Sequence, residues 1–148
     1  MKIKIALLTL AVSFVGAGSA LAMTKEEHKT QKDRIQADYK TSQEKCSALK
    51  GNVKDICHAE AKGVEKVAKA ELEAQYKPSA RNERKTKEAK AEAAYDVAKE
   101  KCDELGGDAK KTCTTEARTA RDAAKAEMKA ETKSGTKEER KDAKPSAG

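Results

Sequence analysis

Hydrophobic and small side chains recur at helical spacing in two stretches of this chain. In residues 35–49 they are separated by steps of four, three, four and three, at Ile35, Tyr39, Ser42, Cys46 and Leu49. The same steps recur in residues 91–105, at Ala91, Tyr95, Ala98, Cys102 and Leu105. Such heptad spacing places every member on one face of an α-helix. The pattern predicts two helices that each bury one stripe.

A glycine follows each stripe, and a second helical stretch follows the glycine. Gly51 and Gly107, the latter preceded by Gly106, suit a turn because glycine adopts a positive φ at little cost. Asn52 and Asp108 are predicted N-caps of the returning helices. The first returning helix has an apolar side formed by Val53, Cys57, Val64, Val67 and Leu72. Its counterpart is poorer, with Ala109, Cys113, Ala117, Ala120, Ala124 and Met128. Each unit is therefore predicted to be a helical hairpin.

The two hairpins are copies of one another, offset by 56 positions. In the first copy Cys46, Leu49, Gly51, Lys54 and Cys57 match Cys102, Leu105, Gly107, Lys110 and Cys113 of the second. A fixed period of this length usually means one supersecondary unit per repeat. We predict hairpin repeats at residues 23–78 and 79–134, separated at Pro78, followed by a flexible tail at 135–148. Thr24 with Glu27 predicts a capping box at the start of the first helix, and Ser79 or Asn82 a cap for the third.

The cysteines predict two disulfides within the hairpins. Cys46 lies five residues before Gly51 and Cys57 lies six after it, so a hairpin that turns at the glycine brings them together. Cys102 and Cys113 have the same placement around Gly107. Four cysteines allow three connectivities, and the symmetric spacing favours Cys46–Cys57 and Cys102–Cys113. Each bond would stabilise the fold by roughly 2–3 kcal/mol.

The N-terminal segment has the pattern of a cleaved secretory signal. Lys2 and Lys4 precede an uncharged run over 5–18, and Ala20-Leu21-Ala22 provides small residues for cleavage. We predict a signal peptide at residues 1–22, cleaved after Ala22, and a periplasmic protein. The apolar run is too short for a convincing membrane span, so we expect no integral membrane protein after cleavage. Disulfides persist in such an exported location.

Composition then limits the fold. Removing Lys2 and Lys4 from 32 basic residues leaves 30, against 25 acidic ones. The chain has no Trp and three Tyr, so it cannot build a thick globular core. Ala, Lys, Glu and Arg are the strongest helix formers. We predict an all-α fold of two tandem, disulfide-clasped hairpins with four helices, elongated or loosely packed, with a homo-oligomer as one arrangement that this composition allows.

No motif in the chain indicates catalysis, a cofactor or a metal site. Carboxylates alternate with lysines at helical spacing, as in Glu65 and Lys69, which is typical of a solvated face. His58 follows Cys57, but Thr114 takes its place in the second copy, so no set of metal ligands repeats. His28 near the first helix start reads as a partly exposed surface residue. We expect no enzyme, no cofactor and no metal.

The basic residues indicate a mild attraction to anions and no nucleic-acid binding, because charges of both signs alternate along the chain. Four basic side chains cluster just after Pro78 and are candidate anion contacts: Arg81, Arg84, Lys85 and Lys87. Their expected partners are anionic envelope polymers, such as lipopolysaccharide, phospholipid headgroups or cell-wall material. Other envelope proteins are the alternative partners.

The duplicated motif Cys-x-x-Leu-x-Gly-x-x-Lys-x-x-Cys, with Tyr76-Lys77-Pro78-Ser79 between its copies, resembles a group of exported bacterial proteins. These are rich in Ala, Lys and Glu, carry a signal peptide, and are sometimes labelled TolA-like cell-envelope-biogenesis proteins. The resemblance implies a periplasmic location and no established activity. Three function classes follow: a structural or interaction protein of the envelope, a helical holdase chaperone or stress protein, and a metal- or anion-binding module.

Overall fold

The computed structural model describes residues 23–142, with side chains through residue 131. Helix α1 spans Lys25–Ser47, α2 Gly51–Tyr76, α3 Ala80–Cys102 and α4 Gly107–Asp142. Helices account for nearly all of the described residues. The all-α, four-helix fold predicted from the sequence is confirmed. The predicted signal peptide at 1–22 lies outside the described residues.

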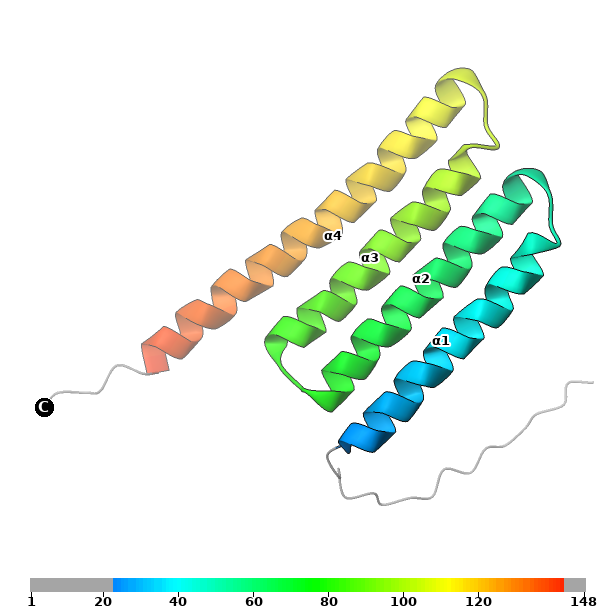
Figure 1. Cartoon of the computed structure of the whole chain (residues 1–148). Helices are drawn as coiled ribbons and strands as arrows, with labels where there is room; N and C mark the ends of the chain where they lie inside the picture. The colour runs from blue at the N-terminus through cyan, green and yellow to red at the C-terminus, as the bar shows by residue number, and fades with distance from the viewer. Residues whose placement is uncertain (1–22, 143–148) are drawn as a thin grey trace, which may run out of the picture.

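The four helices lie side by side in chain order, each antiparallel to the next (Figure 1). Within residues 23–142, each helix contacts only its neighbours in sequence, so α1 and α4 form the two edges of one layer. The most extensive contact is between α2 and α3, which belong to different repeats. We call α1 with α2 hairpin 1, and α3 with α4 hairpin 2. The hairpins are thus joined side by side into a single body rather than stacked into a closed bundle.

Local sequence determines where the helices begin. The predicted capping box is confirmed, with the Thr24 backbone N–H donating to the Glu27 carboxylate at 2.8 Å and the Glu27 N–H donating to the Thr24 hydroxyl at 3.1 Å. The Ser79 hydroxyl accepts a 3.2 Å bond from the Asn82 N–H and so caps α3. The prediction of Asn52 and Asp108 as N-caps is wrong, because Gly51 and Gly107 are already the first residues of α2 and α4, which places Asn52 and Asp108 inside the first turn.

Helix α4 continues beyond the predicted end of the second hairpin at residue 134. It includes residues 135–142, which the sequence pattern assigned to a flexible tail, and ends at Asp142. The segment contains lysines and glutamates, which have high helix propensity. Residues 143–148 of the predicted tail lie outside the described part of the chain.

The buried core is small and follows the duplication. Cys46 and Cys102 are equivalent, as are Leu72 and Met128, and all four are buried; a fifth buried apolar residue, Ala89, is an exception, because its equivalent is the exposed Asp33. The predicted apolar stripes are only partly buried, because Leu49, Leu105, Val53 and Val64 are exposed. A helix in the middle of a single layer has neighbours on two sides and open surface on the other two, so a wide apolar face cannot be covered completely. Val64, at 70% exposure, is the extreme case.

Candidate interaction surface

Two disulfides hold the hairpins at their closed ends, with the connectivity predicted from the sequence. Cys46 is bonded to Cys57 with a Cα–Cα distance of 5.5 Å, and Cys102 to Cys113 with one of 5.6 Å. The glycine between each pair lies in the turn, with φ of 58° at Gly51 and 54° at Gly107. Both turns lie at the same end of the layer (Figure 1). The clasps therefore fix the register of each hairpin independently.

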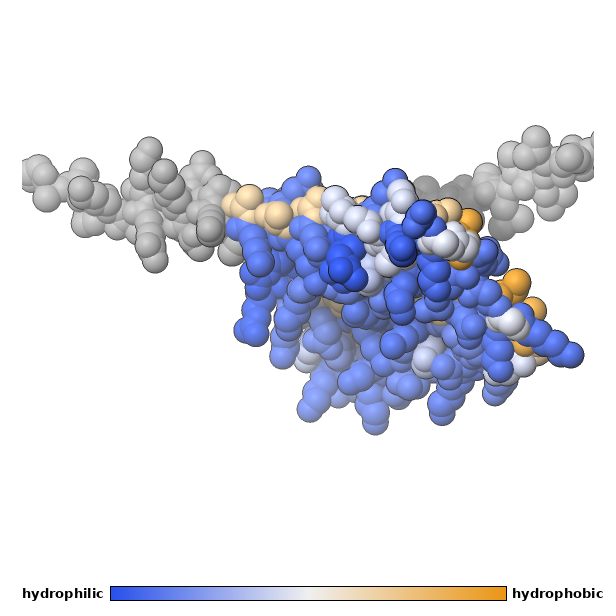
Figure 2. Space-filling model, turned by 90° about the horizontal axis from the view of Figure 1, so that it is seen from above, coloured by the Kyte–Doolittle hydropathy of each residue, from blue (hydrophilic) through white to orange (hydrophobic). Residues whose placement is uncertain are grey.

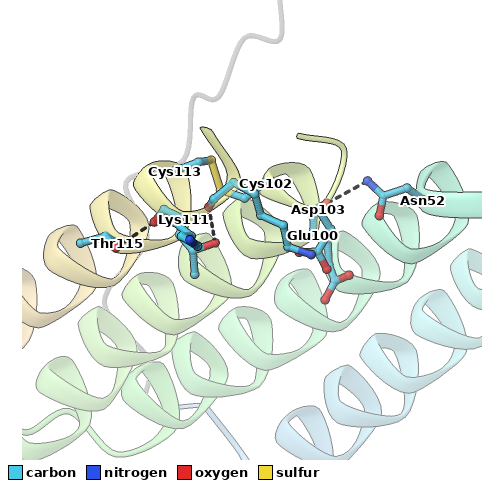
Figure 3. The surroundings of a disulfide bond; sticks show 9 residues. Asn52, Glu100, Cys102, Asp103, Lys111, Cys113 and Thr115 are labelled. Atoms are coloured by element: carbon cyan, nitrogen blue, oxygen red, sulfur yellow. Dashed lines mark hydrogen bonds and ion pairs between the residues drawn. A yellow bond between two sulfur atoms is a disulfide. The ribbon is translucent and has the colours of Figure 1, made fainter. Parts of the chain in front are cut away.

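Asn52 links the closed end of hairpin 1 to the end of α3. Its side-chain amide donates a 2.8 Å hydrogen bond to the Glu100 carbonyl, beside the Cys102–Cys113 clasp (Figure 3). The Glu100 carbonyl also accepts a 3.2 Å bond from the Asp103 N–H, so the Asn52 amide is a second donor to it in the last turn of α3. The equivalent residue in hairpin 2, Asp108, has no amide donor and instead forms an ion pair with Lys111 at 3.3 Å. Asn52 is thus part of the contact between α2 and α3, which we call the joint between the hairpins.

The joint between the hairpins relies on a close approach of two small residues. Gly63 of α2 is buried against Ala93 of α3, and a Cβ on Gly63 would lie 3.0 Å from the Ala93 Cβ. A larger side chain at either position would push the helices apart. Thr119 occupies the position equivalent to Gly63 on the outer helix α4. The outer edge of the layer therefore lacks the small residue on which the joint depends.

An apolar groove of about 710 Å³ runs between α2 and α3 on the surface of the layer. We call it the α2–α3 groove; its apolar lining is Gly63, Val64, Val67 and Ala68 of α2 with Ala93, Ala94, Val97 and Ala98 of α3. The surface in Figure 2 is largely hydrophilic, with pale and orange residues gathered along one side. A chain with such sparse apolar content thus leaves three valines at a single exposed site.

One pair of oppositely charged side chains lies at each end of this groove. The Lys101 amino group lies 3.4 Å from the Glu60 carboxylate, and that of Lys90 lies 2.7 Å from Glu71. On both helices the two charged residues are eleven positions apart, about three helical turns. The α2 side is therefore acidic at both ends and the α3 side basic at both ends. All four side chains remain partly exposed to solvent.

Contacts inside hairpin 2 are mainly electrostatic. Lys125 of α4 forms an ion pair with Glu92 of α3, and the hydrogen bond from Lys125 lowers the pKa of the Glu92 carboxyl. The Arg121 guanidinium lies over the Tyr95 ring, 4.2 Å from its centroid. Arg121 also donates to the Asp122 carboxylate, which raises the pKa of the guanidinium. Such contacts hold α3 and α4 together with few buried apolar groups.

Hairpin 1 is held at its open end by a histidine. The His28 ring stacks on Tyr76 with a centroid distance of 4.3 Å, and its Nε2 lies 2.8 Å from the Glu73 carboxylate. His28 is half-buried and bridges α1 to α2, so it has a packing role beyond that of a surface residue. The predicted ion pair of Glu65 with Lys69 is present at 2.6 Å.

The predicted basic cluster lies on the first turns of α3. Arg81, Arg84, Lys85 and Lys87 are all exposed there. Lys87 forms an ion pair with Glu131 of α4 at 2.6 Å, so its charge is partly satisfied within the protein. Anion contact at this cluster stays a prediction.

No group of three or more His, Cys, Asp or Glu side chains within the described residues is arranged to hold a metal ion. All four cysteines are in disulfides. None of the helices in residues 23–142 is both long and apolar enough to cross a membrane. The disulfides fit an oxidising compartment.

Comparisons with known protein families, with curated proteins and with solved structures found no match. The α2–α3 groove was not predicted from the sequence, although a signal for it was present. Val64 and Val97 of the groove correspond to Ala120 and Thr41 in the other copy. The groove residues are therefore found among the positions at which the two copies differ, whereas the repeat was recognised from the positions at which they agree.

Proposed function

We propose that this chain is an exported, non-enzymatic interaction protein of the periplasm, a flat helical spacer or adaptor that docks through the α2–α3 groove. The observation that carries the proposal is Val64, which is 70% exposed at the centre of an apolar surface. Exposed apolar patches bordered by polar groups are typical of interaction sites. The signal-like segment at residues 1–22 and the two disulfides support export.

The single-layer architecture also supports an interaction role. Because each described helix contacts only its neighbours, both broad sides of the layer are accessible. The clasps keep the hairpins in register without a thick core, which leaves side chains on the broad sides free to make external contacts. A rigid, thin platform of this kind suits a spacer or adaptor better than an enclosed active site.

Site-specific photo-crosslinking in the native envelope tests this proposal. A photoreactive residue at Val64 is expected to give a discrete adduct, whereas the same residue at Ala120, its equivalent on α4, gives none. The Val97→Asp substitution should abolish the Val64 adduct, because it places a charge in the groove. Absence of any adduct from Val64 at native expression would overturn docking through the groove.

A holdase chaperone is the second candidate, and the same groove favours it. Holdases bind exposed apolar segments of unfolded clients, and the α2–α3 groove offers such a surface within one chain. The mature protein with intact disulfides is then expected to suppress aggregation of a heat-denatured client, and Val64→Asp to remove the effect. No suppression at molar excess would exclude this candidate and leave the adaptor role.

A further inference from the structure

We propose that the occupant of the α2–α3 groove is a second copy of the same chain, giving a twofold dimer with a four-helix centre. This inference rests on the proposed role of the groove as a docking surface and names its partner. In the dimer, α2 of each copy lies across from α3 of the other, and the two grooves face each other. The central apolar residues of both copies then share one buried layer.

The apolar residues in the groove are not explained by packing within one chain. Val64 is the clearest example, because the contact between α2 and α3 leaves 70% of it exposed. At the equivalent places in the other copy, Val64 corresponds to Ala120, Val67 to Ala123 and Val97 to Thr41. Three valines thus lie on one surface of the layer, at positions where the other copy has smaller or polar residues. Burial of a valine stabilises by about 1.5–3 kcal/mol relative to exposure, so a partner that covers them would bind with a clear driving force.

The charges at the groove ends are self-complementary in one orientation. The α2 side carries Glu60 and Glu71, and the α3 side carries Lys90 and Lys101. If the twofold axis runs parallel to the helices, each end of the dimer brings together two acidic and two basic side chains. Going around the four helices, the signs alternate, so every adjacent pair attracts. This pattern makes a second copy a suitable occupant.

The other face-to-face orientation is disfavoured by the same charges. A twofold axis perpendicular to the helices would place α2 over α2 of the second copy, with Glu60 opposite Glu71. It would likewise place Lys101 opposite Lys90 on the α3 side. Like charges at close range repel, so this orientation is less favourable than the one in which the signs alternate. The parallel axis is therefore the expected one.

Burial of the groove leaves much of the rest of the molecule open. The outer helices α1 and α4, and the basic cluster at Arg81, Arg84 and Lys85, do not line the groove. A dimer therefore keeps these surfaces available for other envelope contacts. Self-association through the groove is therefore compatible with adaptor contacts at these other surfaces.

The first test is analytical ultracentrifugation of the protein from Met23 onward with both disulfides intact. Twice the monomer mass is expected, and a monomer at every concentration up to about 0.5 mM would overturn the proposal. Val64→Asp should raise the dissociation constant at least about tenfold, because it buries an unpaired carboxylate. Ala120→Asp is the matched control and should leave the dimer unchanged. Circular dichroism establishes that each variant retains its helices.

Charge exchange then tests the orientation. Glu71→Lys and Lys90→Glu should each weaken the dimer, because each creates like-charge neighbours at one end. The double variant Glu71→Lys with Lys90→Glu should restore it, because the signs alternate again. Stronger association of Glu71→Lys would contradict the parallel axis, since it is the result expected when Glu60 faces residue 71 of the second copy. The loss in the single variants should shrink at high salt.

The in-cell adduct from Val64 separates this inference from the proposed function. An adduct of twice the monomer mass that contains only this chain supports the dimer. An adduct with a different envelope protein, together with a monomer in the centrifuge, overturns the dimer and keeps the adaptor role. Absence of an adduct together with a monomer would remove both.

Discussion

Hairpin 1 and hairpin 2 share a scaffold and differ in what surrounds it. Both have a disulfide at the closed end, a positive-φ glycine in the turn, and one large buried side chain, Leu72 or Met128. Outside this frame the copies diverge: hairpin 1 joins its helices through the His28–Tyr76 stack, and hairpin 2 through Arg121 on Tyr95.

The comparison shows which interactions a thin helical hairpin requires. Both copies have a disulfide and one large buried side chain besides the cysteines, while the contacts between their helices differ. The exposed sides are then free to specialise, as in the valines of the α2–α3 groove. The two copies therefore differ in the α2–α3 groove and at the contact between them.

Removal of a clasp should break the comparison most severely. The Cys102→Ser/Cys113→Ser variant is expected to lower the free energy of unfolding by about 3 kcal/mol, because the unfolded chain gains loop entropy. The matched variant Cys46→Ser/Cys57→Ser should lose a similar amount. Hydrogen exchange should nevertheless rise further across α4 than across α2, because α4 has the poorer apolar side. Equal protection of α4 in both variants would show that its packing does not depend on the clasp.

Truncation of the buried residue at the equivalent positions is the next largest perturbation. Leu72→Ala and Met128→Ala should each cost about 2–4 kcal/mol of unfolding free energy, as measured by urea denaturation. Leu72 belongs to the inner helix α2, which has neighbours on both sides, so its loss should also loosen the joint with α3. A Val64→Ala control should change stability little, since Val64 is already exposed in the monomer. A neutral Leu72→Ala would contradict the assigned core.

An exchange of residues between the joint and the outer edge should sharpen the comparison. Gly63→Thr, which copies Thr119, should destabilise the protein by about 1–2 kcal/mol, because the new side chain meets Ala93. The reciprocal Thr119→Gly, on the exposed side of α4, should cost less than about 1 kcal/mol through helix propensity. Thermal unfolding followed by circular dichroism measures both. If the two variants cost the same, Gly63 is not needed for close approach.

The smallest effect is expected on acidification. The pKa of Glu92 is lowered in the folded protein by its hydrogen bond from Lys125, so the pair stabilises at neutral pH. That contribution is present above the unfolded carboxyl pKa and is lost as the pH falls through the lower, folded value. Hairpin 1 has Gln36 at the equivalent position, which does not titrate. Glu92→Gln should therefore reduce the acid sensitivity of the α3–α4 contact, measured by hydrogen exchange against pH, with Gln36→Glu as the reciprocal variant.

The disulfides, the glycine turns and the first helix cap could be predicted from the sequence because they depend on the spacing of residues close together in the chain. The register of Cys46, Gly51 and Cys57 determines the disulfide and the turn together, and the second copy confirms the pattern. The capping box at Thr24 is likewise a property of four consecutive residues. These features depend little on how the hairpins pack.

The joint and the groove were missed because they depend on the relation between the repeats. A search for large apolar residues favours Val53 and Val64 as core positions, yet both are exposed. The close approach of α2 and α3 depends on Gly63 and Ala93, which such a search overlooks because their side chains are small. The N-cap prediction failed at Asn52 and Asp108 because the glycines expected in the turns are already the first residues of α2 and α4.

The two disulfides also limit how far the chain can be stretched. The paired cysteines are eleven positions apart, so each bond withholds the ten residues between them from any tension applied at the chain ends. Two such segments, fully extended, would span about 70 Å. The length of the fully stretched chain therefore depends on whether the two disulfides are reduced. Their reduction would add this length without changing a noncovalent contact at either end of the chain.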